Sequence, residues 1–325
     1  MSSKARRSVI SSFFRIIYQV LRTNPVVWLI IGLSAIFSAL FPGSFLTMTN
    51  LSGILKNFVV TSMLAIGPTF PVLMGSLDLS YLGIWMFGAI LVWLAFPYLG
   101  MFSIIVYPLF GLAVGIANGL LHVKVKIPSF ILTLCISVVF IFLTGIVSGG
   151  FPKTVEPYLF LTKSPIPYLP SSFLLSLPVI AVAVFLGCST KLGSYLCAIG
   201  SNEEGVQLAG INVEKYKILA LTVSGLITGL GSIVAFIHLG ARGPVLFDLN
   251  DFIRPLIAIV LGGTPLVGGL GGPHRTLLGA LGYVLIFNGL FLAGINPDHF
   301  RLYIGAALVA AVAIASKGFK GVLVT

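Results

Sequence analysis

Apolar residues dominate this chain in long runs, and short polar stretches separate one run from the next. A helix that crosses a membrane needs roughly 20 mostly apolar residues. The pattern predicts ten such helices, at residues 25–41, 54–74, 81–98, 101–121, 129–149, 172–189, 217–238, 252–269, 276–293 and 301–316. The sequence therefore predicts an all-α, polytopic integral membrane protein with about ten transmembrane helices.

The composition agrees with a membrane protein. Hydrophobic residues make up 58% of the chain, charged residues only 8%, and the mean hydropathy is +1.11. We expect a basic cytoplasmic segment at 1–24, a transmembrane domain at 25–316 and a cytoplasmic tail at 317–325. No small-residue cleavage site follows the first apolar run, which argues against a removed signal peptide.

The positive charges predict the orientation. An even number of spans places both termini on one side, and we predict that side to be the cytoplasm. Thirteen of the 19 lysines and arginines then face the cytoplasm, namely Lys4, Arg6, Arg7, Arg15, Arg22, Lys124, Lys126, Lys191, Lys215, Lys217, Arg275, Lys317 and Lys320. This asymmetry is typical of membrane proteins. It explains the net charge of +11 through topology and anionic membrane lipid, so nucleic-acid binding is not needed as an explanation.

The sequence offers no constellation for covalent chemistry. Its three cysteines have no paired spacing, its four histidines are scattered at the ends of the predicted spans, and no phosphate-binding GxxxxGK[ST] segment is present. We therefore predict no catalytic residues, no metal site, no cofactor and no ATP hydrolysis by this chain.

Residues 200–217, GSNEEGVQLAGINVEKYK, form a charged island between two apolar runs. Asn202 is a good helix N-cap, and Glu203 and Glu204 follow it at the positive end of the helix dipole. We interpret the island as a short cytoplasmic docking helix that a partner outside the bilayer recognises. The alternative is an ordinary solvated loop.

The segment 74–80, MGSLDLS, is too short and too apolar for a solvent loop, yet it contains Asp78. A carboxylate at membrane depth costs at least ~2.5 kcal/mol, so it normally faces a cavity, a partner helix or an interface. Two compatible interpretations are open. Asp78 caps the helix that begins near Ser80, or it lines a polar pathway at a broken helix.

The segment 261–275, LGGTPLVGGLGGPHR, holds six glycines and two prolines and cannot form one smooth helix. A hinge, a tight helix contact and a re-entrant break all fit this composition. For Gly225, Gly229 and Gly231 in SGLITGLG, we expect a packing role in which two helices approach closely.

Four motifs carry a resemblance to a known family. They are MGSLDLS, GIANGLLHVKVKIPSFILTL at 115–134, GSNEEGVQLAGINVEKYKILALTVSGLITGLGSIV at 200–234, and VLGGTPLVGGLGGPHRTLLGALGYVLIFNGLFLAG at 260–294. Over residues 50–310 the chain resembles the bacterial ABC-type sugar permeases of the ribose, galactose, xylose and autoinducer-2 group.

The resemblance implies a type II-like ABC importer permease in the bacterial inner membrane. Such a permease pairs with a second copy or a paralogue. Separate cytoplasmic ATPase subunits drive it, and a periplasmic or lipid-anchored solute-binding protein supplies its cargo. ATP hydrolysis is then expected in the ATPase subunits.

The family's coupling helix corresponds here to residues 203–211, within a cytoplasmic loop at about 190–216. The residues that we assign to ATPase coupling are Glu203, Glu204, Gly205, Leu208, Ala209, Gly210 and Ile211. Leu208, Ala209 and Ile211 would form a small apolar knob, and the two glutamates would meet basic residues around it. Relatives more often carry alanine at Gly205 and arginine at Gln207, which favours a cognate ATPase.

Several polar residues lie in otherwise apolar surroundings. An unsatisfied polar group there is costly unless it meets a partner or a hydrated cavity. We assign these residues to the substrate pathway: Asn57, Asp78, Asn118, Thr264 and Asn288. We expect at least Asn57 and Asn288 to lie near the central axis of a permease dimer.

Two departures from the family's pattern bear on the cargo. Relatives usually have an acidic residue in the stretch where this chain has Arg254, and a basic residue where it has Leu270. Arg254 either faces the pathway, where it would favour acceptor-rich or anionic solutes, or extends toward a lipid headgroup.

Two other functions remain open. One is a permease of the same superfamily that carries nucleosides or branched-chain amino acids. The other is a stand-alone secondary transporter or channel, which would need ion-coupling carboxylates within its spans, and Asp78 alone is thin support for that.

Overall fold

The structure, a computed structural model, describes residues 25–246, 248–296, 299, 302–303 and 305. The described residues are mostly helical, and their only β-structure is two isolated bridges. The predicted all-α class is confirmed. The segment 1–24, most of the tenth predicted span and the tail 317–325 lie outside the described residues.

The helices follow the predicted apolar runs. In chain order they are α2 (Pro25–Leu40), α3 (Met48–Ile66), α4 (Thr69–Leu73), α5 (Tyr81–Leu99), the 3-10 helix η1 (Gly100–Ile105), α6 (Val106–Lys124), α7 (Ser129–Ser148), the 3-10 helix η2 (Glu156–Thr162), α8 (Ser171–Cys188), α9 (Lys191–Ser201), α10 (Glu203–Leu208), α11 (Val213–His238), α12 (Leu249–Leu261) and α13 (Pro273–Leu292).

Three predicted spans are not single α-helices. The span 54–74 is divided into α3 and α4 at Gly67 and Pro68, and the span 101–121 begins as the 3-10 helix η1. The span 252–269 ends as a helix at Leu261, because the glycine-rich segment follows. At 1.5 Å per residue, the 13 residues of α12 extend about 20 Å. That is shorter than the apolar core of a bilayer, which is roughly 30 Å thick.

Five helical stretches among the described residues are long and apolar enough to cross a membrane. They are Tyr81–Lys124, which joins α5 to α6, and then Ser129–Ser148, Ser171–Cys188, Val213–His238 and Pro273–Leu292. The apolar helix α2 is shorter, with 16 residues. The described residues thus include several helices with the length and composition to span a membrane, while the number ten stays a prediction.

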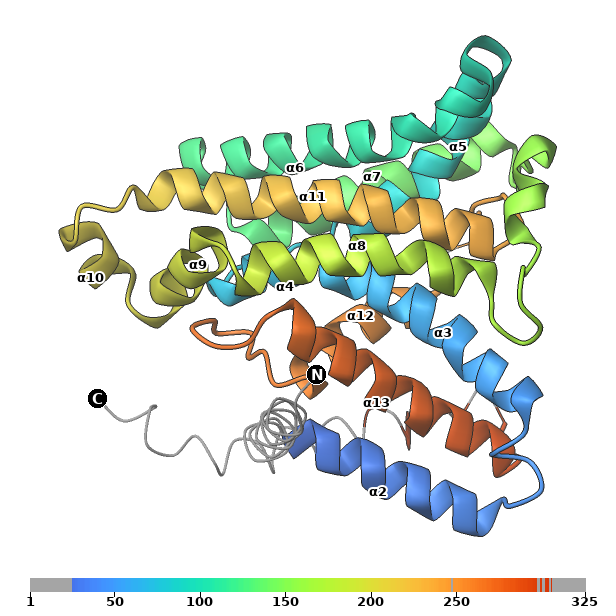
Figure 1. The fold of residues 1–325 in the computed structure, drawn as a ribbon. Helices are drawn as coiled ribbons and strands as arrows, with labels where there is room; N and C mark the ends of the chain where they lie inside the picture. The colour runs from blue at the N-terminus through green and yellow to red at the C-terminus, as the bar shows by residue number, and fades with distance from the viewer. Residues whose placement is uncertain (1–24, 247, 297–298, 300–301, 304, 306–325) are drawn as a thin grey trace, which may run out of the picture.

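Helices α6 and α11 form the closest pair and run side by side in Figure 1. A methyl group at Gly111 of α6 would overlap the carbonyl oxygen of Gly225 of α11, and one at Gly225 would overlap that of Gly111. Gly115 and Gly229 face the partner backbone in the same way. The packing role predicted for Gly225, Gly229 and Gly231 is confirmed, since Gly231 lies in the same way against the backbone of Met63 in α3.

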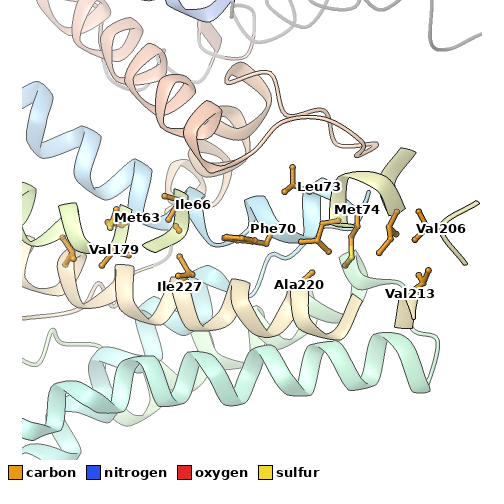
Figure 2. Close-up of a cluster of buried hydrophobic side chains, with 14 of the residues drawn as sticks. Met63, Ile66, Phe70, Leu73, Met74, Val179, Val206, Val213, Ala220 and Ile227 are labelled. Atoms are coloured by element: carbon orange, nitrogen blue, oxygen red, sulfur yellow. The ribbon is translucent and has the colours of Figure 1, made fainter. Parts of the chain in front are cut away.

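The largest core cluster extends from the middle of the protein to the short helices at one end. It joins α3, α4, α8, α9, α10 and α11, and Figure 2 shows its side chains in a row between α4 and α11. Phe70 lies at its centre, while Val206 and Val213 close the row beside α10. Helices α2 and α13 form a second layer with α3 and α12.

We predict that Gly225→Ala destabilises the protein by roughly 1–3 kcal/mol, because the added methyl group pushes α6 and α11 apart. Gly145→Ala is the matched control, since nothing lies within 4 Å of a Cβ at that position of α7. The control is expected to gain up to about 1 kcal/mol from helix propensity. Thermal unfolding in detergent measures both variants. A melting temperature that rises in both would contradict the close contact.

Candidate functional site

The helix break at 74–80 is held by a row of hydroxyl groups on α7. Backbone N–H groups at the start of α5 would lack partners in apolar surroundings. Three hydroxyls, spaced four residues apart on one face of α7, accept hydrogen bonds from this region. The bonds run from Leu77 N to Ser129 Oγ (3.2 Å), from Leu79 N to Thr133 Oγ1 (2.9 Å) and from Gly83 N to Ser137 Oγ (3.0 Å).

Asp78 lies at the centre of this break and is 1% exposed. Its Oδ1 accepts hydrogen bonds from the Ser80 backbone N–H at 2.9 Å and from the Ser80 hydroxyl at 2.6 Å. Its Oδ2 accepts one from the Ser224 hydroxyl of α11 at 2.6 Å. Asn118 of α6 donates to Ser80 Oγ at 3.0 Å. The network therefore connects the start of α5 with both α6 and α11.

These contacts place Asp78 two residues before the N-cap residue Ser80, whose own N–H is bonded to the Asp78 carboxylate. An N-cap side chain accepts instead from the N–H of the second or third helical residue, and the Ser80 side chain makes no such bond, so the contacts support the start of α5 without forming a standard cap. They do not test a role of Asp78 in transport. The Oδ1 atom of Asn118 is buried and has no hydrogen-bond partner among the described residues. Asn118 thus has one polar atom in the network and one outside it.

The glycine-rich segment between α12 and α13 folds as an irregular loop. Thr264 Oγ1 accepts a hydrogen bond from Gly272 N at 3.2 Å, which closes the loop on itself. Gly269 N donates to the carbonyl oxygen of Leu73 at 2.9 Å, which ties the loop to the end of α4. Gly268 and Gly269 both have φ near +85°, a conformation that favours glycine. The predicted interruption of the helix is confirmed.

The remaining two pathway residues lie apart from Asp78. Asn288 of α13 forms a reciprocal pair with Asn50 of α3, with N···O distances of 2.8 and 3.2 Å. Asn57 is exposed on α3 and donates to Gly53 O of its own helix. The structure therefore joins Asp78 and Asn118 in one network and leaves Asn57, Thr264 and Asn288 in separate surroundings. Their role in a pathway stays a prediction.

Arg254 has a local partner that the sequence interpretation did not consider. Its guanidinium pairs with the carboxylate of Asp251, one turn earlier on α12. The Tyr81 hydroxyl of α5 donates to the carbonyl oxygen of Phe252 in the same turn. An acidic residue is thus present near the position where relatives carry one, and it partly neutralises Arg254.

The predicted docking segment contains a short helix. The Asn202 side chain accepts a hydrogen bond from Gly205 N at 2.9 Å, so the predicted helix start is confirmed. Gly210, at φ +81°, follows the helix. Leu208 is 90% exposed, and Glu203, Glu204 and Ala209 are exposed as well.

The apolar knob is smaller than the sequence predicted. Ile211 is only partly exposed and packs against the core cluster that contains Val206 and Val213. It follows Gly210, whose conformation turns the chain back toward the start of α11. Leu208 and Ala209 therefore form the exposed apolar surface, and Ile211 anchors the segment.

Helix α9 connects this segment to both helix breaks. A methyl group at Gly200 would overlap the carbonyl oxygen of Leu73 and the backbone nitrogen of Gly269. The Ser201 hydroxyl lies 3.4 Å from the carbonyl oxygen of Gly269. The backbone of α9 thus lies directly against the end of α4 and the glycine-rich loop.

Cys188 and His274 lie beside the glycine-rich loop, since a methyl group at Gly272 would approach both side chains. Cys188 Sγ lies 3.0 Å from His274 Nδ1. Burial raises the pKa of the Cys197 thiol, although the positive charge of Arg275 acts in the opposite direction. Among the described residues, no group of three or more histidine, cysteine or acidic side chains is placed to hold a metal ion.

An all-helical protein with several membrane-spanning helices and a charged helix outside them is a multi-pass membrane protein. Residues 50–312 match the family described as branched-chain amino acid transport system / permease component, and the chain belongs to that family. It is therefore a transport permease subunit and not an enzyme. No solved structure matches the chain at a significant level.

Several sugar permeases are similar to this chain over most of its length. The ribose import permease of Haemophilus influenzae is 31% identical and aligns with 90% of this chain and 92% of its own length. The ribose import permease of Bacillus subtilis is 30% identical, over 84% and 87%. The D-allose transport system permease of Escherichia coli is 28% identical, over 86% and 87%. The resemblance to sugar permeases is confirmed.

We expect Asp78→Asn to keep normal membrane abundance and most of the transport activity. The amide oxygen still accepts from Ser80, and the Ser224 hydroxyl can rotate to accept from the amide nitrogen. Asp78→Ala removes every acceptor and leaves buried donors unpaired, at about 1–3 kcal/mol each. We expect it to lower the amount of folded protein. Quantitative immunoblotting and solute uptake measure both effects, and normal abundance without uptake in Asp78→Asn would overturn the structural role.

Proposed function

We propose that this chain forms the translocation pathway of a bacterial ABC importer for a monosaccharide or a related small polar solute. Separate ATPase subunits drive it, and a solute-binding protein, periplasmic or lipid-anchored, supplies the cargo. The observation that carries this proposal is the exposed helix α10, joined through α9 to both helix breaks. Similarity to ribose and allose permeases over more than four-fifths of the chain supports a sugar as the cargo.

The proposed topology has ten spans with both termini in the cytoplasm of a bacterium. Lys124 ends α6, and Lys215 and Lys217 lie at the start of α11, where Lys124 pairs with Glu214 and Lys217 pairs with Glu203 of α10. This clustering of lysines at the α10 end supports a cytoplasmic position for that end. The second permease is either an identical copy or a paralogue.

The proposed mechanism is alternating access. Closure of the ATPase dimer would move α10 and α9 together, because the core cluster and the Gly200 contact join them to α4. The glycine-rich loop would follow, since Gly269 is bonded to Leu73. The loop follows the C-terminal end of α12, so the movement would pass along α12 to Asp251 and Arg254 in its first turns. The chain supplies the route and the coupling, and two conformations with different ATPase contacts suffice to drive it.

We predict that Leu208→Asp weakens binding of the ATPase by the permease. Leu208 is 90% exposed, so the substitution leaves the fold intact while it places a charge on the apolar docking surface. Co-purification of the ATPase with tagged permease measures the effect, and we expect a loss of at least roughly tenfold in affinity, or about 1.4 kcal/mol.

Leu246→Asp is the matched control, because Leu246 is 82% exposed in the connection between α11 and α12. It introduces the same charge away from α10. Wild-type ATPase capture and uptake in Leu208→Asp would exclude α10 as the docking element.

The cargo is tested by competition. Uptake of radiolabelled ribose into cells that express the whole transporter is measured with excess unlabelled xylose, allose, leucine or adenosine. We expect a pentose or hexose to compete and leucine and adenosine to have no effect. Competition by leucine alone would instead favour the amino acid cargo that the family description names.

A further inference from the structure

A polar groove lies beside α10, between that helix and the connection from α6 to α7. Its volume is about 720 Å³. One wall is formed by the segment His122–Pro128, and the other by α10 and the first turn of α11. The groove therefore lies next to the exposed surface formed by Leu208 and Ala209. Its other wall comes from the segment His122–Pro128, about 80 residues earlier in the chain.

Both walls are fixed by ion pairs. Lys124 Nζ lies 2.8 Å from Glu214, which joins the end of α6 to the start of α11. Lys217 Nζ lies 2.7 Å from Glu203, which joins α11 to α10. Exposed pairs of this kind contribute little to stability, at about 0.2–1 kcal/mol each. Their consequence here is that two lysines and two glutamates of the groove region already have partners.

Lys126 is different, because it forms no ion pair with any described residue. Its backbone has φ +61°, a conformation that is uncommon for lysine and costs energy unless its surroundings impose it. Next to it, the ring of His122 forms a 2.8 Å hydrogen bond with the carbonyl oxygen of Ile127, which ties the turn back to the end of α6. The turn thus presents at the groove an ammonium group that has no ion-pair partner among the described residues, although its charge also acts on Glu214 across the groove.

We propose that this groove is a second docking site for the ATPase subunit and that Lys126 binds a carboxylate side chain of the ATPase. The inference rests on the proposed function, in which α10 is the first contact. A segment that enters the groove meets Lys126 on one wall and Glu203 and Gln207 of α10 on the other. The ATPase therefore contacts α10 both at its exposed end, Leu208 and Ala209, and along the side that lines the groove.

An anionic lipid headgroup is the competing occupant, since lysines near a membrane surface attract such lipids. Recognition of anionic lipid usually takes a cluster of about 4–8 lysines or arginines. The groove lining instead holds two lysines, Lys126 and Lys217, balanced by two glutamates, Glu203 and Glu214. The groove chemistry therefore favours the protein partner.

The test measures binding of the purified ATPase subunit that co-purifies with tagged wild-type permease. Permease in detergent without anionic lipid is compared as wild type, Lys126→Asn, Lys126→Glu and Lys215→Glu. Asparagine tolerates the positive φ, so Lys126→Asn removes the charge and keeps the turn. Lys215 is exposed on the same end but does not line the groove, so Lys215→Glu controls for net charge.

We expect Lys126→Asn to weaken ATPase binding several-fold and Lys126→Glu to weaken it at least roughly tenfold. Lys215→Glu should bind like the wild type. The salt dependence of binding should also be smaller in Lys126→Asn than in the wild type, because one charge contact is lost. Membrane abundance and size-exclusion profiles confirm that each variant is folded.

Three results would overturn the inference. Wild-type binding by Lys126→Glu, together with lost binding in Leu208→Asp, would leave α10 as the docking element and remove the groove. Equal losses in Lys126→Glu and Lys215→Glu would show an effect of net charge only. An effect of Lys126→Asn that appears only in vesicles containing anionic lipid would assign Lys126 to the membrane. If neither Leu208→Asp nor Lys126→Glu weakens binding, the assignment of α10 as the docking helix in the proposed function is itself rejected.

Discussion

Backbone polar groups have no water to bind inside a bilayer, so a broken helix survives there only if other groups replace its lost hydrogen bonds. This chain breaks its helices at 74–80 and at 262–272. Hydroxyls of α7 and the carboxylate of Asp78 accept bonds from the first break, and Thr264 and Leu73 accept bonds from the second. The positions of α5, α7, α12 and α13 all depend on these replacements.

The two breaks matter because they meet at the cytoplasmic end of the proposed topology. Gly200 allows α9 to lie against the end of α4 and the glycine-rich loop together. The buried cluster from Phe70 to Val206 adds apolar packing between the same elements (Figure 2). In the proposed mechanism, a displacement of α10 would therefore pass through backbone contacts and close-packed side chains, which transmit displacement better than flexible loops do.

The sequence predicted the helices well, because continuous apolar runs and glycine or proline interruptions are strong local signals. It predicted the helix start at Asn202 because an asparagine N-cap followed by two glutamates is also a local signal. The hydrogen-bond partners of polar residues were harder to predict, since they depend on which helices become neighbours in the fold. Nothing local pairs Asn50 with Asn288, which is 238 positions away. The hydroxyls at Ser129, Thr133 and Ser137 did carry a signal, because their spacing of four residues marks one helix face. The prediction that Ile211 belongs to the exposed apolar knob was wrong, because the turn at Gly210 that directs Ile211 toward the core depends on tertiary packing.

The contact between α6 and α11 restricts which residues the chain can hold there, independently of the solute. Its glycines contribute contact through backbone atoms alone, so almost any larger residue is excluded at Gly111 and Gly225 whatever the solute. Exposed positions such as Asn57 on α3 are free of that restriction. A substitution at such an exposed position would therefore leave the contact between α6 and α11, and the fold that depends on it, unchanged.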